Sequence, residues 1–103
     1  PNYVDAYRIA KAYFFLKDSN NARKYYKLSY KMNPKLYAVY FQLGMVSLFL
    51  DKNIKESIKN FEEFVNKAPK DERKLQEVKK LVDFLKHSSK KDIEKLNIEY
   101  KFP

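Results

Sequence analysis

The chain has 103 residues and a formal net charge of +9, from 22 Lys and Arg against 13 Asp and Glu. Its length allows one small domain with a single core. The absence of Cys excludes a disulfide scaffold, a cysteine-ligated metal site and a thiol enzyme. An apolar content of 45% is too high for a disordered chain, and one Gly with four Pro disfavours an all-β fold because hairpins consume turn residues. These numbers favour an all-α fold.

Hydropathy predicts no membrane span. The longest apolar runs, residues 12–16 and 45–50, are far shorter than the ~20 residues that a bilayer requires. The chain begins with Pro1 rather than Met, so we expect it to be part of a longer protein. The composition leaves the cellular compartment open.

Apolar side chains recur at helical spacing along almost the whole chain. Asn2 is the expected N-cap of the first helix, because its side chain can accept a hydrogen bond from the first turn. Short polar or proline-containing breaks separate the elements, at residues 17–20, 33–34, 51–53, 68–70 and 88–91. The predicted helices are residues 3–16, 21–32, 36–50, 54–67 and 71–87, with one further helical turn in 92–96.

The end of the chain changes period. Apolar side chains there alternate with polar ones over seven residues, which predicts an extended, strand-like tail. The apolar positions are Leu96, Ile98, Tyr100 and Phe102.

The first four predicted helices repeat one pattern. Pro34 and Pro69 are 35 residues apart, and the polar breaks at residues 17–20 and 51–53 fall at matching places before them. Self-similarity at this period indicates a repeat architecture. Gly44 in mid-helix costs ~1 kcal/mol relative to Ala, so we expect a close helix contact there.

With this pattern the chain resembles the tetratricopeptide repeat family, whose unit of ~34 residues is a helix-turn-helix with large and small residues in fixed slots. The first unit fills these slots with Ala6, Ile9, Ala10, Tyr13, Ala22, Tyr26, Ser29 and Pro34. The second fills them with Tyr40, Leu43, Gly44, Ser47, Ser57, Phe61, Phe64 and Pro69, and has one extra residue in its inter-helix turn. The resemblance implies a right-handed α-superhelix of antiparallel helical hairpins, with about five helices and an extended C-terminal tail.

The expected organisation is a helical domain at residues 1–90 followed by a linker and tail at 91–103. Within the domain we expect repeat one at residues 3–35, repeat two at 36–70 and a capping helix at 71–87. Such arrays usually need about three repeats for stability. We therefore expect the tail, self-association or the rest of the parent protein to supply further burial.

The sequence offers little for catalysis, so we expect no enzyme, no cofactor and no metal site. His87 is the sole His and lies beside a Ser/Lys linker. The carboxylate pairs Glu62-Glu63 and Asp71-Glu72 are adjacent in sequence, and adjacent side chains on a helix do not converge. There is no Gly-rich phosphate loop, and no carboxylate cluster has the spacing of metal ligands.

The resemblance implies a partner-binding concave face lined by the first helix of each unit. We therefore predict a non-enzymatic protein–protein interaction module, a scaffold or adaptor that binds an apolar or amphipathic peptide or helix. Leu48 and Phe14 have an alternative role in packing between helices, whereas Tyr7, Phe41 and Met45 are expected to be exposed. The predicted partner-binding residues are Tyr7, Lys11, Phe14, Phe41, Gln42 and Met45, with Leu48 and Ala38 beside them.

Some family members clamp a carboxylate terminus on this face with a Lys/Asn/Arg set. Tyr7, Lys11 and Gln42 stand at three of the corresponding places, so only a generic Lys of that set is present.

The second predicted helix carries a basic patch of Arg23, Lys24, Lys27 and Lys31. An alternative function is therefore binding of nucleic acid or an anionic membrane through this helix. Lys predominates over Arg, however, and a solvated outer face explains the same residues. The tail has three possible roles. It docks on a neighbouring molecule in self-association, it begins the next domain, or it folds back onto the groove, and we favour the first two.

Overall fold

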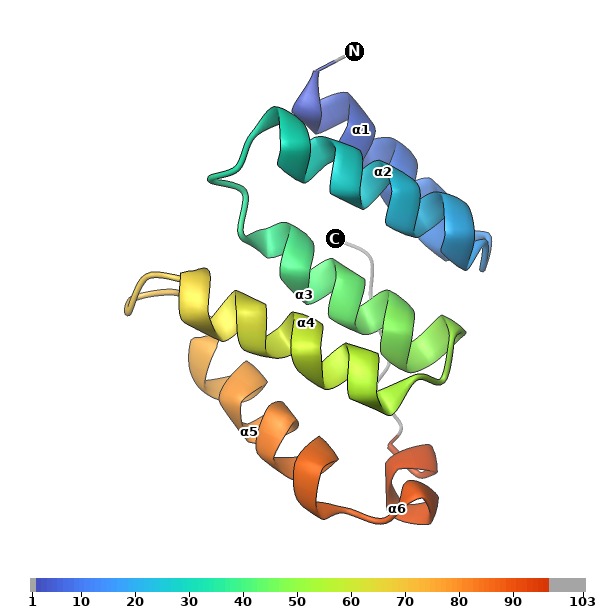
Figure 1. The fold of residues 1–103 in the computed structure, drawn as a ribbon, viewed down its shortest axis with the longest axis vertical. Helices are drawn as coiled ribbons and strands as arrows, with labels where there is room; N and C mark the ends of the chain where they lie inside the picture. The colour runs from blue at the N-terminus through green and yellow to red at the C-terminus, as the bar shows by residue number, and fades with distance from the viewer. Residues whose placement is uncertain (1, 97–103) are drawn as a thin grey trace.

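The computed structural model describes residues 2–96, all of whose regular structure is helical (Figure 1). Two antiparallel helical hairpins, α1–α2 and α3–α4, are stacked side by side, and α5 packs against α4. The elements are α1 (Tyr3–Phe15), α2 (Ser19–Met32), α3 (Ala38–Met45), the π-helical turn η1 (Val46–Leu50), α4 (Ile54–Lys67), α5 (Leu75–His87) and α6 (Lys90–Glu94). The prediction of an all-α fold built from helical hairpins is confirmed.

Side-chain caps determine where α1, α2 and α4 begin. The Asn2 side chain accepts a hydrogen bond from the backbone N–H of Asp5 at 2.9 Å, as predicted. Asp18 caps α2 in the same way at 3.1 Å, and Asn53 caps α4 at 3.0 Å. Each cap satisfies a backbone donor that has no partner within the helix. Because Asp18 is the cap, α2 begins at Ser19, earlier than predicted.

Two predicted helix starts were too early. The third helix begins at Ala38 rather than residue 36, and the fifth begins at Leu75 rather than residue 71. A turn precedes α5, in which the Glu72 carboxylate accepts the N–H of Lys74 at 2.7 Å. This hydrogen bond satisfies a backbone N–H of the turn, where the hydrogen bonds of α5 have not yet begun.

The predicted linker at residues 88–91 is shorter in the structure, because Ser89 caps the short helix α6 through the N–H of Asp92 at 3.1 Å. The predicted strand-like tail, with Ile98, Tyr100 and Phe102, lies outside the described residues.

The π-helical turn η1 accommodates the extra residue of the second hairpin. In the first hairpin, the N–H of the cap Asp18 donates to the carbonyl of Tyr13 at 2.9 Å. In the second, the N–H of the cap Asn53 donates to the carbonyl of Ser47 at the same distance, one residue further back along the chain. Widening of the helix to i→i+5 bonding absorbs that residue, so both second helices start from an equivalent cap.

The contact between α3 and α4 explains the single glycine. A Cβ at Gly44 would lie 2.5 Å from the nearest ring atom of Phe61, far inside van der Waals contact. Phe61 is fully buried, as is Ser57 on the same helix. The prediction of a packing role for Gly44 is confirmed.

The core is centred on α3 and η1. Residues 42–48 are all buried, because α3 lies between α2 and α4 (Figure 1). By contrast, α1 forms the edge of the stack and buries only Ala6, Ala10 and Phe14. A helix that is apolar all round is typical of such a central position.

Candidate functional site

Tyr7 and Phe41 make the same contact in the two hairpins. The Tyr7 ring packs edge-on against Tyr26, with centroids 5.4 Å apart, and Phe41 packs against Phe61 at 5.8 Å. Both Tyr7 and Phe41 are half-buried. Each aromatic residue of the first helix thus rests on the large aromatic residue of the second helix and keeps part of its surface exposed.

A lysine lies over each of these two rings. The Nζ of Lys11 is 5.7 Å from the centroid of Tyr7, and the Nζ of Lys74 is 4.4 Å from that of Phe41. A cation over an aromatic face is attracted by the ring quadrupole. Positive charge therefore borders the accessible aromatic surface in both hairpins, with Lys74 contributed from the turn before α5.

A hollow of about 200 Å³ lies between α3 and α5. Its floor is apolar, because Val78 and Met45 are buried and Leu81 is half-buried. Its polar lining comes from Lys74 and Glu77, which are exposed and carry opposite charges. The lining residues are Phe41, Met45, Lys74, Glu77, Val78 and Leu81.

Three of the predicted partner-binding residues are buried in the structure: Phe14, Gln42 and Met45. The expected exposure of Met45 was wrong, since only 3% of its surface is accessible on the central helix α3. Phe14 and Leu48 are both buried, so their alternative role in packing between helices is confirmed. The accessible part of the predicted set is Tyr7, Lys11 and Phe41.

Gln42 has a structural role within the core. Its side-chain oxygen accepts a hydrogen bond from the Tyr26 hydroxyl at 3.4 Å. Burial raises the pKa of the Tyr7 hydroxyl, and a hydrogen bond with Gln42 partly offsets that rise. Gln42 therefore links α3 to both helices of the first hairpin.

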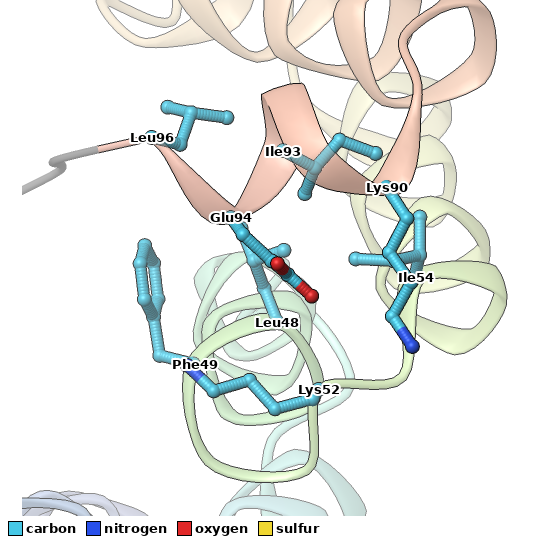
Figure 2. A pocket seen from close by; sticks show the side chains of 8 residues that line it. All are labelled: Leu48, Phe49, Lys52, Ile54, Lys90, Ile93, Glu94 and Leu96. Carbon is cyan, nitrogen blue, oxygen red and sulfur yellow. The ribbon is translucent and has the colours of Figure 1, made fainter.

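A second and larger hollow, of about 410 Å³, lies where α6 meets the end of the second hairpin's first helix (Figure 2). Apolar side chains from η1, α4 and α6 line it together with three charged ones. They are Leu48, Phe49, Lys52, Ile54, Lys90, Ile93, Glu94 and Leu96. Sequence reasoning missed this hollow, although the three-residue spacing of Ile93 and Leu96 was a signal that this turn has an apolar side.

The predicted basic patch is only partly available. Arg23 forms an ion pair with Asp51, the residue that follows η1, and so ties α2 to the second hairpin. The other three residues of the patch, Lys24, Lys27 and Lys31, are exposed on α2. The Nζ of Lys24 lies 5.6 Å from the ring centroid of Tyr25.

Residues 2–96 contain no group of three or more His, Asp or Glu side chains arranged to hold a metal ion. The Nδ1 of His87 lies 3.2 Å from a carboxylate oxygen of Asp83, one helical turn away on the exposed end of α5. None of the helices in this part of the chain is long and apolar enough to cross a membrane.

Two antiparallel hairpins with matching aromatic contacts, 34 to 35 positions apart, define the class of helical-repeat proteins. The family model for the tetratricopeptide repeat matches residues 6–36, which cover most of α1, all of α2 and the turn that follows. This match assigns residues 6–36 to a tetratricopeptide repeat. Searches of curated proteins and of solved structures found no match.

Repeats of this family are non-catalytic units that generally mediate protein–protein interactions and scaffolding. The matched segment contains most of the first hairpin and ends before α3. The repeat-two boundaries at residues 36–70 and the capping role of residues 71–87 therefore stay predictions. Their support is the contact of Phe41 with Phe61, which is equivalent to that of Tyr7 with Tyr26.

Proposed function

We propose that the face presented by α1, α3 and α5 binds an apolar or amphipathic peptide or helix of a partner protein, and that the chain acts as a scaffold or adaptor. The observation that carries this proposal is the hollow between α3 and α5. It combines an apolar floor with exposed Lys74 and Glu77. Binding sites of this composition bury an apolar anchor and orient it through a few polar groups.

The lining of the hollow favours a particular kind of ligand. Phe41, Val78 and Leu81 offer contact to one large apolar side chain of the ligand. Lys74 and Glu77 carry opposite charges and can pair with polar groups that flank this side chain. An amphipathic segment meets both requirements, whereas a uniformly charged one leaves the floor unfilled.

The experiment uses a displayed library of short random peptides, selected against the immobilised full chain. We expect the selected peptides to share a large apolar residue with polar neighbours. The affinity of one such peptide, labelled with fluorescein, is then measured by anisotropy. Leu81→Glu places a charge in the hollow, so we expect at least a tenfold loss of affinity, about 1.4 kcal/mol.

The matched control is Phe84→Glu, an apolar-to-acidic change three residues away at an exposed position of α5. It should leave the affinity unchanged. Circular dichroism and thermal melting of both variants separate loss of binding from loss of fold, and exposed Lys74→Glu tests the same hollow without touching the core. Equal affinities in Leu81→Glu, Lys74→Glu and Phe84→Glu would refute the proposed site.

The alternative function, binding of nucleic acid or an anionic membrane, rests on Lys24, Lys27 and Lys31, which are exposed on α2. Such binding falls steeply with salt, because it releases condensed counterions. It would be abolished by changing all three residues to Glu, with no effect from Leu81→Glu. The pair of experiments therefore assigns function to one face or the other.

A further inference from the structure

The hollow beside α6 has the size of a small-molecule site. Its volume is about 410 Å³, about twice that of the hollow between α3 and α5. Pockets that hold small molecules measure about 300–1,000 Å³. The walls come from η1, the start of α4 and α6, and no lining residue is shared with the proposed peptide site (Figure 2). This hollow is therefore a second site, separate from the proposed function.

Five of the eight residues that line the hollow are apolar. Leu48 and Ile93 are buried beneath it, whereas Phe49, Ile54 and Leu96 are half-buried and keep part of their surface accessible. Removing apolar surface from water is favourable roughly in proportion to the area removed. The hollow therefore favours a ligand with an apolar body.

The charged part of the lining carries an excess of one positive charge, because Lys52 and Lys90 accompany a single carboxylate, Glu94. Figure 2 shows the two lysine side chains at opposite sides of the hollow, with Glu94 extending from α6 toward η1. Within residues 2–96 neither lysine forms an ion pair, whereas Lys67 and Lys86 each pair with a glutamate. Both ammonium groups are exposed and available to a ligand.

The start of α4 adds to this positive potential. Ile54, the first residue of α4, lines the hollow, so the N-terminal end of a helix of 14 residues lies beside it. The helix dipole places partial positive charge at that end. Lys52, Lys90 and the start of α4 thus favour an anion, and Glu94 alone opposes one.

We propose that the hollow beside α6 binds a small, free monocarboxylate with an apolar body. The apolar body packs against Leu48, Phe49 and Ile93, and the carboxylate accepts charge-assisted hydrogen bonds from Lys52 or Lys90. A single negative charge matches the net charge of the lining. Binding here does not depend on the peptide site between α3 and α5.

Straight-chain carboxylates from hexanoate to dodecanoate are the probes, each kept below the concentration at which it forms micelles. The ¹⁵N-labelled full chain is titrated with each probe at physiological salt. We expect saturable shift changes at the amides of Leu48, Phe49, Ile54 and Ile93. Affinity should rise about fourfold with each added methylene until the hollow is full. Shift changes that do not saturate at these amides, for any chain length, would overturn the proposal.

Charge variants test the role of the two lysines, with decanoate as probe. Lys52→Gln combined with Lys90→Gln should weaken binding about tenfold or more, because both donors to the carboxylate are lost. Glu94→Gln should strengthen binding, because it removes the repulsion. The matched control, Lys27→Gln combined with Lys59→Gln, removes two lysines from exposed positions of α2 and α4 and should leave the affinity unchanged. Equal losses in the two double variants would refute a specific carboxylate site.

An uncharged ligand completes the test. Decanamide keeps the hydrocarbon chain of decanoate and replaces its carboxylate, so it should bind the unchanged chain about tenfold more weakly. Its affinity should be the same in the variant that lacks Lys52 and Lys90. Thermal melting of each variant checks that the fold is retained. Equal affinities of decanoate and decanamide for the unchanged chain would show that the hollow has no preference for an anion.

Discussion

At the scale of single residues, the contact between Gly44 and Phe61 sets how closely α3 and α4 approach each other. In an exposed helix, Gly44→Ala would stabilise by ~1 kcal/mol through helix propensity. Here the added Cβ would meet a buried ring at 2.5 Å, and overpacking costs typically 1–3 kcal/mol. We expect Gly44→Ala to lower the free energy of unfolding by about 1–2 kcal/mol in urea titrations.

A double-mutant cycle is the control for this prediction. Phe61→Leu shortens the residue that the new methyl group meets, so Gly44→Ala should cost less in that background. Additive effects, or stabilisation by Gly44→Ala alone, would show that the α3–α4 contact is looser than described.

Glu72 gives a pH dependence at the entrance to α5. Its pKa is lowered first by the N–H of Lys74, which donates at 2.7 Å, and further by the hydroxyl of Tyr37, which donates at 2.9 Å. The folded pKa lies below the unfolded one, so this carboxylate stabilises the fold above the unfolded value of about 4.3. The contribution disappears as the pH falls through the folded pKa.

We therefore expect Glu72→Gln to lower the urea midpoint at pH 7 and to have a smaller effect near pH 3. Tyr37→Phe removes one of the two donors to this carboxylate and keeps the ring, so it should show a weaker trend of the same sign. A Glu72→Gln effect that is constant with pH would contradict the assigned hydrogen bonds.

The sequence predicted the small and large core residues better than it predicted the accessible ones. The repeat pattern predicted a close helix contact at Gly44, and the structure shows this contact against Phe61. Met45 and Gln42 were expected on the accessible face, yet both are buried because their helix is covered on several sides. The near-continuous apolar run of this helix was a usable signal, since a one-sided helix shows a polar stripe.

At the scale of the elements, the turn inside each hairpin contains a non-glycine residue in the left-handed region. Lys17 has φ of 60° and Lys52 has φ of 55°. This conformation is unfavourable for residues with a Cβ, whereas Gly adopts it freely. We expect Lys17→Gly to raise the free energy of unfolding by about 0.5–1 kcal/mol, net of the greater entropy of the unfolded chain.

The control for the turn is Lys17→Ala, which removes the same charge and keeps the Cβ. It should bring no comparable gain in thermal stability. Lys52→Gly should behave like Lys17→Gly, because both residues stand in equivalent turns. If Gly destabilises either turn, the left-handed assignment is wrong.

Helix boundaries were predictable where a cap or a proline marks them, and α4 at residues 54–67 is the best example. The π-helical turn η1 was not predictable, although the sequence shows the extra residue in the second hairpin. An inserted residue can lengthen a loop or widen a helix. Which of these occurs depends on where Asn53 must lie for α4 to pack against α3.

At the scale of the whole molecule, the order of the helices creates the candidate site. The hollow of Phe41 and Leu81 exists because α5 lies next to the second hairpin, so residues about 40 positions apart meet. The hollow beside α6 likewise joins Leu48 to Ile93. Periodicity describes each helix separately and therefore could not predict either hollow.

The net charge of +9 belongs to the whole chain. It bears on which surface binds a partner, the face presented by α1, α3 and α5 or the basic patch on α2. Arg23 is engaged with Asp51, which leaves Lys24, Lys27 and Lys31 as the exposed members of the patch on α2. An acidic partner would be attracted to this side at low salt. The test of the site must therefore be made at physiological ionic strength.

The most direct test of the proposed peptide site is a ¹⁵N–¹H shift map of the full chain, titrated with the selected peptide at physiological salt. We expect the largest shift changes at the amides of Phe41, Val78 and Leu81, with none along the exposed side of α2. Shift changes confined to Lys24, Lys27 and Lys31 would contradict this expectation and would assign binding to the basic patch.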